Sequence, residues 1–98
     1  MTITKQTEDN KLILVLEGRL DTVTAPQLDA ELKAAFEEHD TIEVNMEKLA
    51  YISSAGLRVH HSTHKRVKGS KTLLISNATG TVLDIFESTG FSSFLNLI

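Results

Sequence analysis

The period with which apolar and polar residues alternate changes along this chain, and each period predicts one kind of element. Residues 1–7 are rich in threonine, and Glu8-Asp9-Asn10 forms a turn signal before the apolar run Leu12–Leu16. We therefore predict an antiparallel hairpin that ends at Gly18. The apolar run has no polar alternation, which is typical of a strand that is covered on both faces.

A helical period follows the hairpin. Leu28, Leu32, Ala35 and Phe36 are spaced so that they form one apolar stripe along a helix. Thr24-Ala25-Pro26-Gln27 has the spacing of a capping box, with threonine at the N-cap and proline tolerated in the first turn. This pattern predicts a helix that begins directly after Thr24.

Residues 41–46 alternate cleanly, which predicts a strand with one face in solvent. Its inward side carries Ile42, Val44 and Met46, and its outward side carries Thr41, Glu43 and Asn45. Further along, helices are predicted from Ser53 to about Lys68 and over about 79–89, each followed by a glycine. A third core strand is predicted over 71–76, and the apolar tail 91–98 must be covered, for example as a last short strand.

This order of elements predicts an α/β fold with right-handed crossovers. We expect a small, mostly parallel mixed β-sheet with a leading hairpin, and helices packed mainly on one face. A chain of 98 residues is too short for two full cores, so residues 1–98 are expected to form a single domain.

Composition removes several classes of function. The chain has no cysteine, which excludes disulfides, zinc–thiolate sites and thiol nucleophiles. Its net charge of −3 argues against binding to a nucleic-acid backbone. No apolar run approaches the roughly 20 residues of a membrane-spanning helix, and the amino terminus has no signal-peptide core. We expect a cytoplasmic protein with no membrane partner.

The most informative segment is Ser53-Ser54-Ala55-Gly56-Leu57, at the junction of a loop and a helix. If Ser53 is the N-cap, its oxygen accepts from the N–H of Ala55 or Gly56, and the hydroxyl of Ser54 projects from the first turn into solvent. A hydroxyl presented in this way suits phosphorylation. On spacing alone, however, simple helix capping by the two serines is the favoured interpretation, because serine is among the best N-cap residues.

Three stretches of this sequence resemble one known family. The segment 51–59, YISSAGLRV, resembles the phosphorylation-site motif of bacterial anti-sigma factor antagonists, the STAS family. The segments 18–25, GRLDTVTA, and 86–91, FESTGF, resemble two flanking motifs of the same family. The resemblance covers nearly the whole chain in the right order and implies a STAS-like fold. It also implies a binding protein rather than an enzyme, with no cofactor and no metal.

The implied function is that of a phosphorylation-controlled anti-sigma factor antagonist. The unphosphorylated form captures an anti-sigma factor with serine kinase activity and so frees a sigma factor, and a serine phosphatase reverses the modification. By position, the resemblance places the acceptor serine on Ser54, with Ser53 as the alternative. It also places the family's glycine on Gly56 and its loop aspartate on Asp21. From proximity to Ser54, we expect a partner surface made of Asp21, Thr22, Ser53, Ser54, Gly56, Arg58 and His61.

The sequence departs from the family motif at three positions. Ser53 stands where the family has an acidic residue, Ala55 follows the acceptor, and Arg58 replaces a small residue. Loss of the acidic residue leaves helix capping intact, because serine and aspartate cap about equally well. It also removes a negative charge beside the acceptor and offers a second hydroxyl, which affects the preference of the cognate kinase.

Other interpretations remain open from the sequence. Asp21 is either part of the partner surface or a turn-forming residue. The domain could be an accessory or scaffold subunit, of a transporter or a signalling complex, that is never phosphorylated. A hydrolase that uses Ser54 is disfavoured, because no Gly-x-Ser-x-Gly elbow is present. His60 and His64 have the spacing of two metal ligands but no third ligand, and the basic run from Lys65 to Lys71 fits a solvated helix end.

Overall fold

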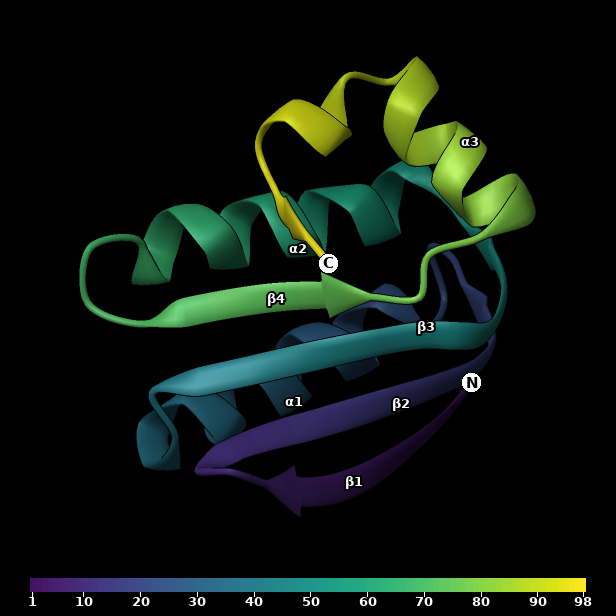
Figure 1. The fold of residues 1–98 in the computed structure, drawn as a ribbon. Helices are drawn as coiled ribbons and strands as arrows, with labels where there is room; N and C mark the ends of the chain where they lie inside the picture. Colours follow the sequence, from purple (N-terminus) through teal and green to yellow (C-terminus); the bar gives the residue numbers. More distant parts are fainter.

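The computed structural model describes residues 1–98 and contains one sheet, three α-helices and one 3₁₀ helix (Figure 1). The elements in chain order are β1 (Thr2–Glu8), β2 (Lys11–Leu20), α1 (Ala25–Glu38), β3 (Thr41–Ile52), α2 (Ser54–Val67), β4 (Thr72–Ser76), α3 (Gly80–Ser88), the 3₁₀ helix η1 (Phe91–Ser93) and β5 (Asn96–Leu97).

The sheet is mixed and has the strand order β1-β2-β3-β4-β5. Strands β1 and β2 form an antiparallel hairpin, whereas every other neighbouring pair is parallel. The hairpin turns at Asp9 and Asn10, which have φ angles of 50° and 67°. Aspartate and asparagine tolerate this left-handed conformation, which two-residue hairpin turns require. The predicted leading hairpin and the mostly parallel sheet are therefore confirmed.

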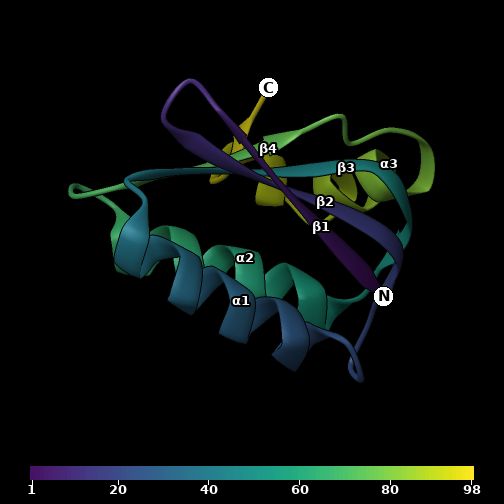
Figure 2. The same ribbon diagram turned by 90° about the horizontal axis from the view of Figure 1, so that it is seen from below.

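Helices α1 and α2 lie side by side across one face of the sheet (Figure 2). Helix α3 lies beyond β4 beside the sheet and packs against the end of β3 (Figure 1). The prediction that helices gather mainly on one face is thus confirmed. The core fills the space between this face and the two helices, and its fully buried members include Leu14, Leu16, Leu28, Leu32, Ile42, Val44, Leu73 and Ile75.

The predicted capping box at the start of α1 is wrong. Thr24 has helical dihedral angles and its side chain makes no capping hydrogen bond to the helix. Its hydroxyl instead donates to the carbonyl of Arg19, 2.8 Å away. The side-chain amide of Gln27 donates to the carbonyl of Met1 rather than returning to Thr24. Hydrogen bonds to Arg19 and Met1 thus take the place of the predicted capping hydrogen bonds between Thr24 and Gln27.

The predicted solvent face of the strand at 41–46 is also wrong at its centre. Glu43 is buried, with 8% of its surface exposed. Its carboxylate accepts from Lys11 Nζ and from Ser76 Oγ, each at 2.6 Å. Both partners come from neighbouring strands, β2 and β4, so the burial follows from strand pairing that the alternation alone does not encode.

Candidate functional site

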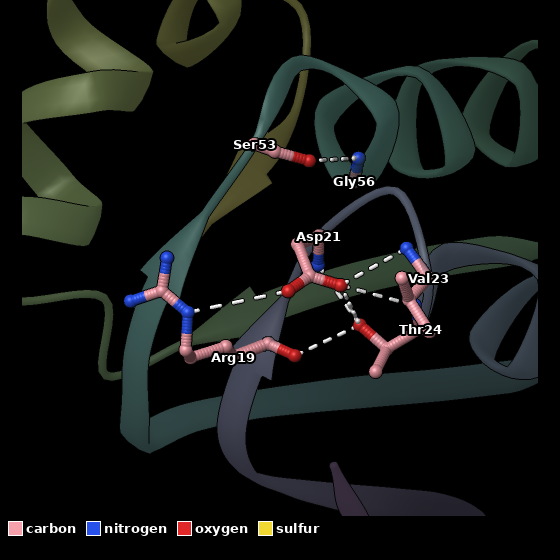
Figure 3. A network of polar contacts seen from close by, with 6 residues as sticks. All are labelled: Arg19, Asp21, Val23, Thr24, Ser53 and Gly56. Atoms are coloured by element: carbon pink, nitrogen blue, oxygen red, sulfur yellow. Dashed lines mark hydrogen bonds and ion pairs between the residues drawn. The ribbon is translucent and has the colours of Figure 1, made fainter.

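The start of α2 is fixed to the end of β2. Ser53 has extended dihedral angles and acts as the N-cap, with its hydroxyl oxygen accepting from the N–H of Gly56 at 3.4 Å (Figure 3). The backbone N–H of Ser53 donates to the carbonyl of Leu20 at 2.8 Å. The predicted N-cap is confirmed, and the first turn of α2 has a defined place above the sheet edge.

Ser54 is the first residue of α2, and its side chain is exposed to solvent. An exposed hydroxyl in the first turn stands near unpaired N–H groups, where negative charge is stabilised. The neighbouring hydroxyl, that of Ser53, is half-buried and already used in capping. The two serines therefore differ in role: the Ser53 hydroxyl caps the helix, whereas the Ser54 hydroxyl is accessible to another molecule.

The loop between β2 and α1 lies beside this first turn and is organised by Asp21 (Figure 3). One carboxylate oxygen, Oδ1, accepts from the N–H groups of Val23 and Thr24, at 3.0 and 3.1 Å. The Asp21 N–H donates to the hydroxyl of Thr24 at 2.8 Å. The backbone hydrogen bond from Thr24 is the largest cause that lowers the pKa of Asp21 below its usual value. Asp21 therefore forms the turn, as one of its two interpretations predicts, and its part in a partner surface stays a prediction.

Arg19 is held in place at the edge of this loop. Its guanidinium lies 4.4 Å from the centre of the Tyr51 ring, a cation–π contact between β2 and β3. Its Nε is 4.0 Å from Asp21 Oδ2 (Figure 3). Both contacts tie this cation to the protein's own groups.

A groove of about 390 Å³ runs between the first turns of α1 and α2. Its walls include Thr22, Pro26 and Asp29 from the α1 side, and Ala55 and Arg58 from α2. The structure therefore brings together the predicted residues of the loop and of the first turns of α2 at one end of the molecule.

His61 lies apart from this groove. Its ring packs against Phe91 and Phe94, with centroid distances of 5.6 and 5.7 Å. These rings belong to η1 and the residue after it, on another side of α2. The structure thus places His61 in an aromatic cluster rather than beside Thr22.

One exposed residue at the site was missed by the sequence interpretation. Val23 lies in the Asp21 loop with 85% of its surface exposed. The signal was an apolar side chain between two threonines, in a loop where no periodic pattern would bury it. Single exposed apolar side chains are common on protein surfaces, so Val23 adds an apolar group beside Asp21 without by itself marking a contact surface.

Of the two histidines that have metal-ligand spacing, His60 belongs to the core of the protein. His60 is fully buried, its Nδ1 lies 3.0 Å from the carbonyl of Gly56, and its ring meets Phe86 edge-on. It therefore does not share an open face with His64. No group of three or more histidine, aspartate or glutamate side chains is arranged to hold a metal ion.

The comparisons with known proteins decide the family. The STAS domain family model matches residues 2–98. This chain belongs to the STAS family. It is 34% identical over 95 residues to the Bordetella bronchiseptica protein BtrV, provisionally named an anti-sigma factor antagonist, covering 95% of this chain and 82% of that protein. The anti-sigma-B factor antagonist of Staphylococcus aureus is 27% identical over 99% of this chain and 92% of its own length.

Solved structures agree on the fold. An anti-sigma factor antagonist from Mycobacterium paratuberculosis superimposes with a TM-score of 0.89 at 18% identity, covering 98% of this chain and 83% of that chain. Unphosphorylated SpoIIAA superimposes with a TM-score of 0.81 at 19% identity, covering 99% and 88%. Phosphorylated SpoIIAA does so at 0.73, covering 99% and 91%. These solved structures share the fold of this STAS protein. The two curated relatives are named as anti-sigma factor antagonists, a class of regulatory binding proteins rather than enzymes.

The structure also bears on the membrane question. None of the three α-helices of this STAS protein has the length and apolar character needed to cross a bilayer.

Proposed function

We propose that this STAS protein is an anti-sigma factor antagonist whose binding is controlled by phosphorylation of Ser54. The unphosphorylated form binds a cytoplasmic anti-sigma factor that has serine kinase activity, and so frees a sigma factor. The kinase phosphorylates Ser54 and releases itself, and a serine phosphatase restores the binding form. The names of the curated relatives support the class of partner.

The observation that carries the proposal is the exposed hydroxyl of Ser54 in the first turn of α2. A kinase can reach it without unfolding the protein. Ser53 is the weaker acceptor, because its oxygen caps the helix through the N–H of Gly56. In the reaction, Ser54 Oγ loses its proton and bonds to the γ-phosphorus of ATP, while ADP leaves.

Magnitudes favour a change in binding rather than in folding. A phosphate adds about −1.5 to −2 charge at pH 7. At the N-terminus of a helix this charge stabilises the protein by roughly 0.3–1 kcal/mol. In a closed interface the same group must lose its water, which costs several kcal/mol per ion. Since every 1.4 kcal/mol changes affinity about tenfold, modification is sufficient to release a partner.

The partner surface in this proposal surrounds Ser54. Asp21 and Thr22 shape the adjoining loop, Gly56 allows the close approach of α2, and Arg58 borders the groove. His61 contributes from the neighbouring side of α2, beside Phe91.

Mass spectrometry with the cognate kinase tests the proposal. Co-expression with the anti-sigma factor kinase is expected to add one phosphate to the wild type and to the Ser53→Ala variant, and none to Ser54→Ala. The phosphorylated wild type should lose affinity for the anti-sigma factor at least tenfold. A phosphate that persists in Ser54→Ala and disappears in Ser53→Ala would move the acceptor to Ser53.

Thermal melting tests the mechanism separately. The phosphorylated protein should melt at the same temperature as the unmodified protein or slightly higher. A loss of about 10 °C without any partner would contradict a binding-only mechanism, since a domain of this size shifts by roughly 4–8 °C per kcal/mol.

The remaining interpretations predict different outcomes in the same samples. An unmodified protein that binds a transporter subunit tightly would favour the accessory role. Ester hydrolysis that disappears in Ser54→Ala would favour a hydrolase.

A further inference from the structure

Arg58 lies one helical turn after Ser54 on the exposed side of α2, and it forms no ion pair in the structure. Four residues of an α-helix turn through about 400°, so the two side chains are offset by only about 40° and a rise of about 6 Å. Helical side chains lean toward the N-terminus. An arginine side chain at position 58 is therefore long enough to reach the turn that carries Ser54, and in the unmodified protein it lines the groove.

The cation of the neighbouring loop region, Arg19, already has partners. Its guanidinium lies 4.4 Å from the centre of the Tyr51 ring, and its Nε is 4.0 Å from Asp21 Oδ2. On α2 itself, Leu57 is buried and His61 packs against aromatic rings.

The groove side adds no further free charge. Asp29 of α1 lines the groove, and its carboxylate is 2.9 Å from Lys33 Nζ.

A phosphate on Ser54 gains from a free cation such as Arg58 beside it. The neighbouring loop carries Asp21, whose hydrogen bonds hold its pKa low and keep it negatively charged. The helix N-terminus stabilises a second negative group here, whereas the Asp21 carboxylate repels it, so a cation beside the phosphate adds to the first effect and offsets the second. An acidic group four residues before a basic one is the favourable order on a helix. The guanidinium fork also matches a phosphate with two parallel hydrogen bonds.

We propose that Arg58 is the phosphate-binding residue of the phosphorylated form, pairing with the phosphoryl group on Ser54. This inference rests on the proposed function. In the unmodified protein the Arg58 side chain borders the groove together with Thr22 and Pro26. After modification it turns to the phosphate and leaves the groove. The partner then meets a new dianion and also loses a cationic contact.

The test uses protein with phosphoserine placed at position 54 by genetic encoding, so that no kinase is needed. The probe is the phosphorus-31 resonance of that phosphate, titrated with pH in the wild type, Arg58→Gln and Arg66→Gln. Arg66 is the matched control, because it lies in the last turn of the same helix and its loss changes the net charge equally.

We expect the second pKa of the phosphate to be higher in Arg58→Gln than in the wild type by about 0.3 pH units, and unchanged in Arg66→Gln. The difference should disappear at 1 M salt, where charges are screened within about 3 Å. The nitrogen-15 resonance of Arg58 Nε should move on phosphorylation in the wild type.

Equal phosphate pKa values in the two variants would overturn the role of Arg58. That result would leave the kinase experiment standing, because the phosphate was installed without a kinase. Conversely, an absence of phosphate on Ser54 in cells would refute the proposed function without altering this titration. Arg58 is exposed, so both variants should melt like the wild type.

Discussion

Gly56 of α2 stands so close to Leu20 at the end of β2 that a Cβ on Gly56 would lie 2.7 Å from Leu20 Cγ. The same Cβ would lie 2.9 Å from Cγ1 of Ile52. Both neighbours are fully buried, at 0% and 1% exposure, so neither can move aside into solvent. The absence of a side chain at this position therefore sets the height of the first turn of α2, and with it the position of Ser54.

Gly56→Ala is expected to lower the free energy of unfolding by about 1–2 kcal/mol, because overpacking costs about 1–3 kcal/mol and the helix propensity of alanine recovers up to about 1. Chemical denaturation measures the change. Ser62→Ala, an exposed substitution in the same helix, is the control and should be near neutral. A Gly56→Ala protein as stable as the wild type would show that α2 is free to lift away from the sheet.

His60 predicts how stability depends on pH. Burial lowers its pKa from 6.5 to about 4, while the hydrogen bond to Gly56 opposes the shift. In the unfolded chain, His60 therefore takes up a proton as the pH falls through about 6.5, whereas in the folded protein it stays neutral until about pH 4. The contribution of neutral His60 to the free energy of unfolding is fully present above pH 6.5 and is lost as the pH falls toward 4. The total loss is on the order of 3 kcal/mol.

Urea denaturation between pH 7 and 5 measures this dependence. The free energy of unfolding of the wild type should fall with a slope that approaches about 1.4 kcal/mol per pH unit. His60→Leu keeps the volume, removes the buried Nε2 that has no partner, and should flatten the slope. His64→Gln should keep it. If the free energy of unfolding of His60→Leu depended on pH as strongly as that of the wild type, the proton taken up on unfolding would belong to another group.

The sequence predicted the elements of the site better than the contacts between them. The two serines and Gly56 correctly indicated where α2 begins, because a helix cap is local. The spacing predicts a cap at Thr24, yet its hydroxyl donates to the carbonyl of Arg19, since the loop folds back on the strand before it. The alternation predicts Glu43 in solvent, yet its carboxylate accepts from Lys11 of β2 and from Ser76 of β4, which are distant in sequence. Local spacing does not encode such pairings.

Glu43 is the one buried acidic side chain of the sheet, and its removal has a predictable cost. The hydrogen bond from Lys11 is the largest cause that lowers its pKa, followed by that from Ser76. Glu43→Gln keeps the shape and loses the charge, so we expect a loss of about 1–2 kcal/mol in the free energy of unfolding at pH 7. The measurement is urea denaturation, because urea, unlike guanidinium chloride, leaves the ionic strength constant.

The sign of the pH effect provides the control for Glu43. A carboxylate with a lowered folded pKa stabilises the protein above its unfolded pKa of about 4.3 and stops doing so as the pH falls through the folded value. The gap between the wild type and Glu43→Gln should therefore shrink below about pH 4.3. A gap that stays constant down to pH 3 would mean that packing, rather than charge, explains the cost.

Asp21 orders the loop beside Ser54 through hydrogen bonds to one of its oxygen atoms. The effect of these hydrogen bonds can be separated experimentally from the effect of the negative charge. The side-chain amide of the Asp21→Asn variant still offers an oxygen to the N–H groups of Val23 and Thr24, whereas Asp21→Ala offers none. Hydrogen exchange of these two amides should be slow in the wild type, slightly faster in Asp21→Asn, and fast in Asp21→Ala. If the partner recognises the conformation of the loop, its affinity should be highest for the wild type, slightly lower for Asp21→Asn and lowest for Asp21→Ala. If Asp21→Asn binds as poorly as Asp21→Ala while its amides stay protected, the partner contacts the carboxylate charge itself.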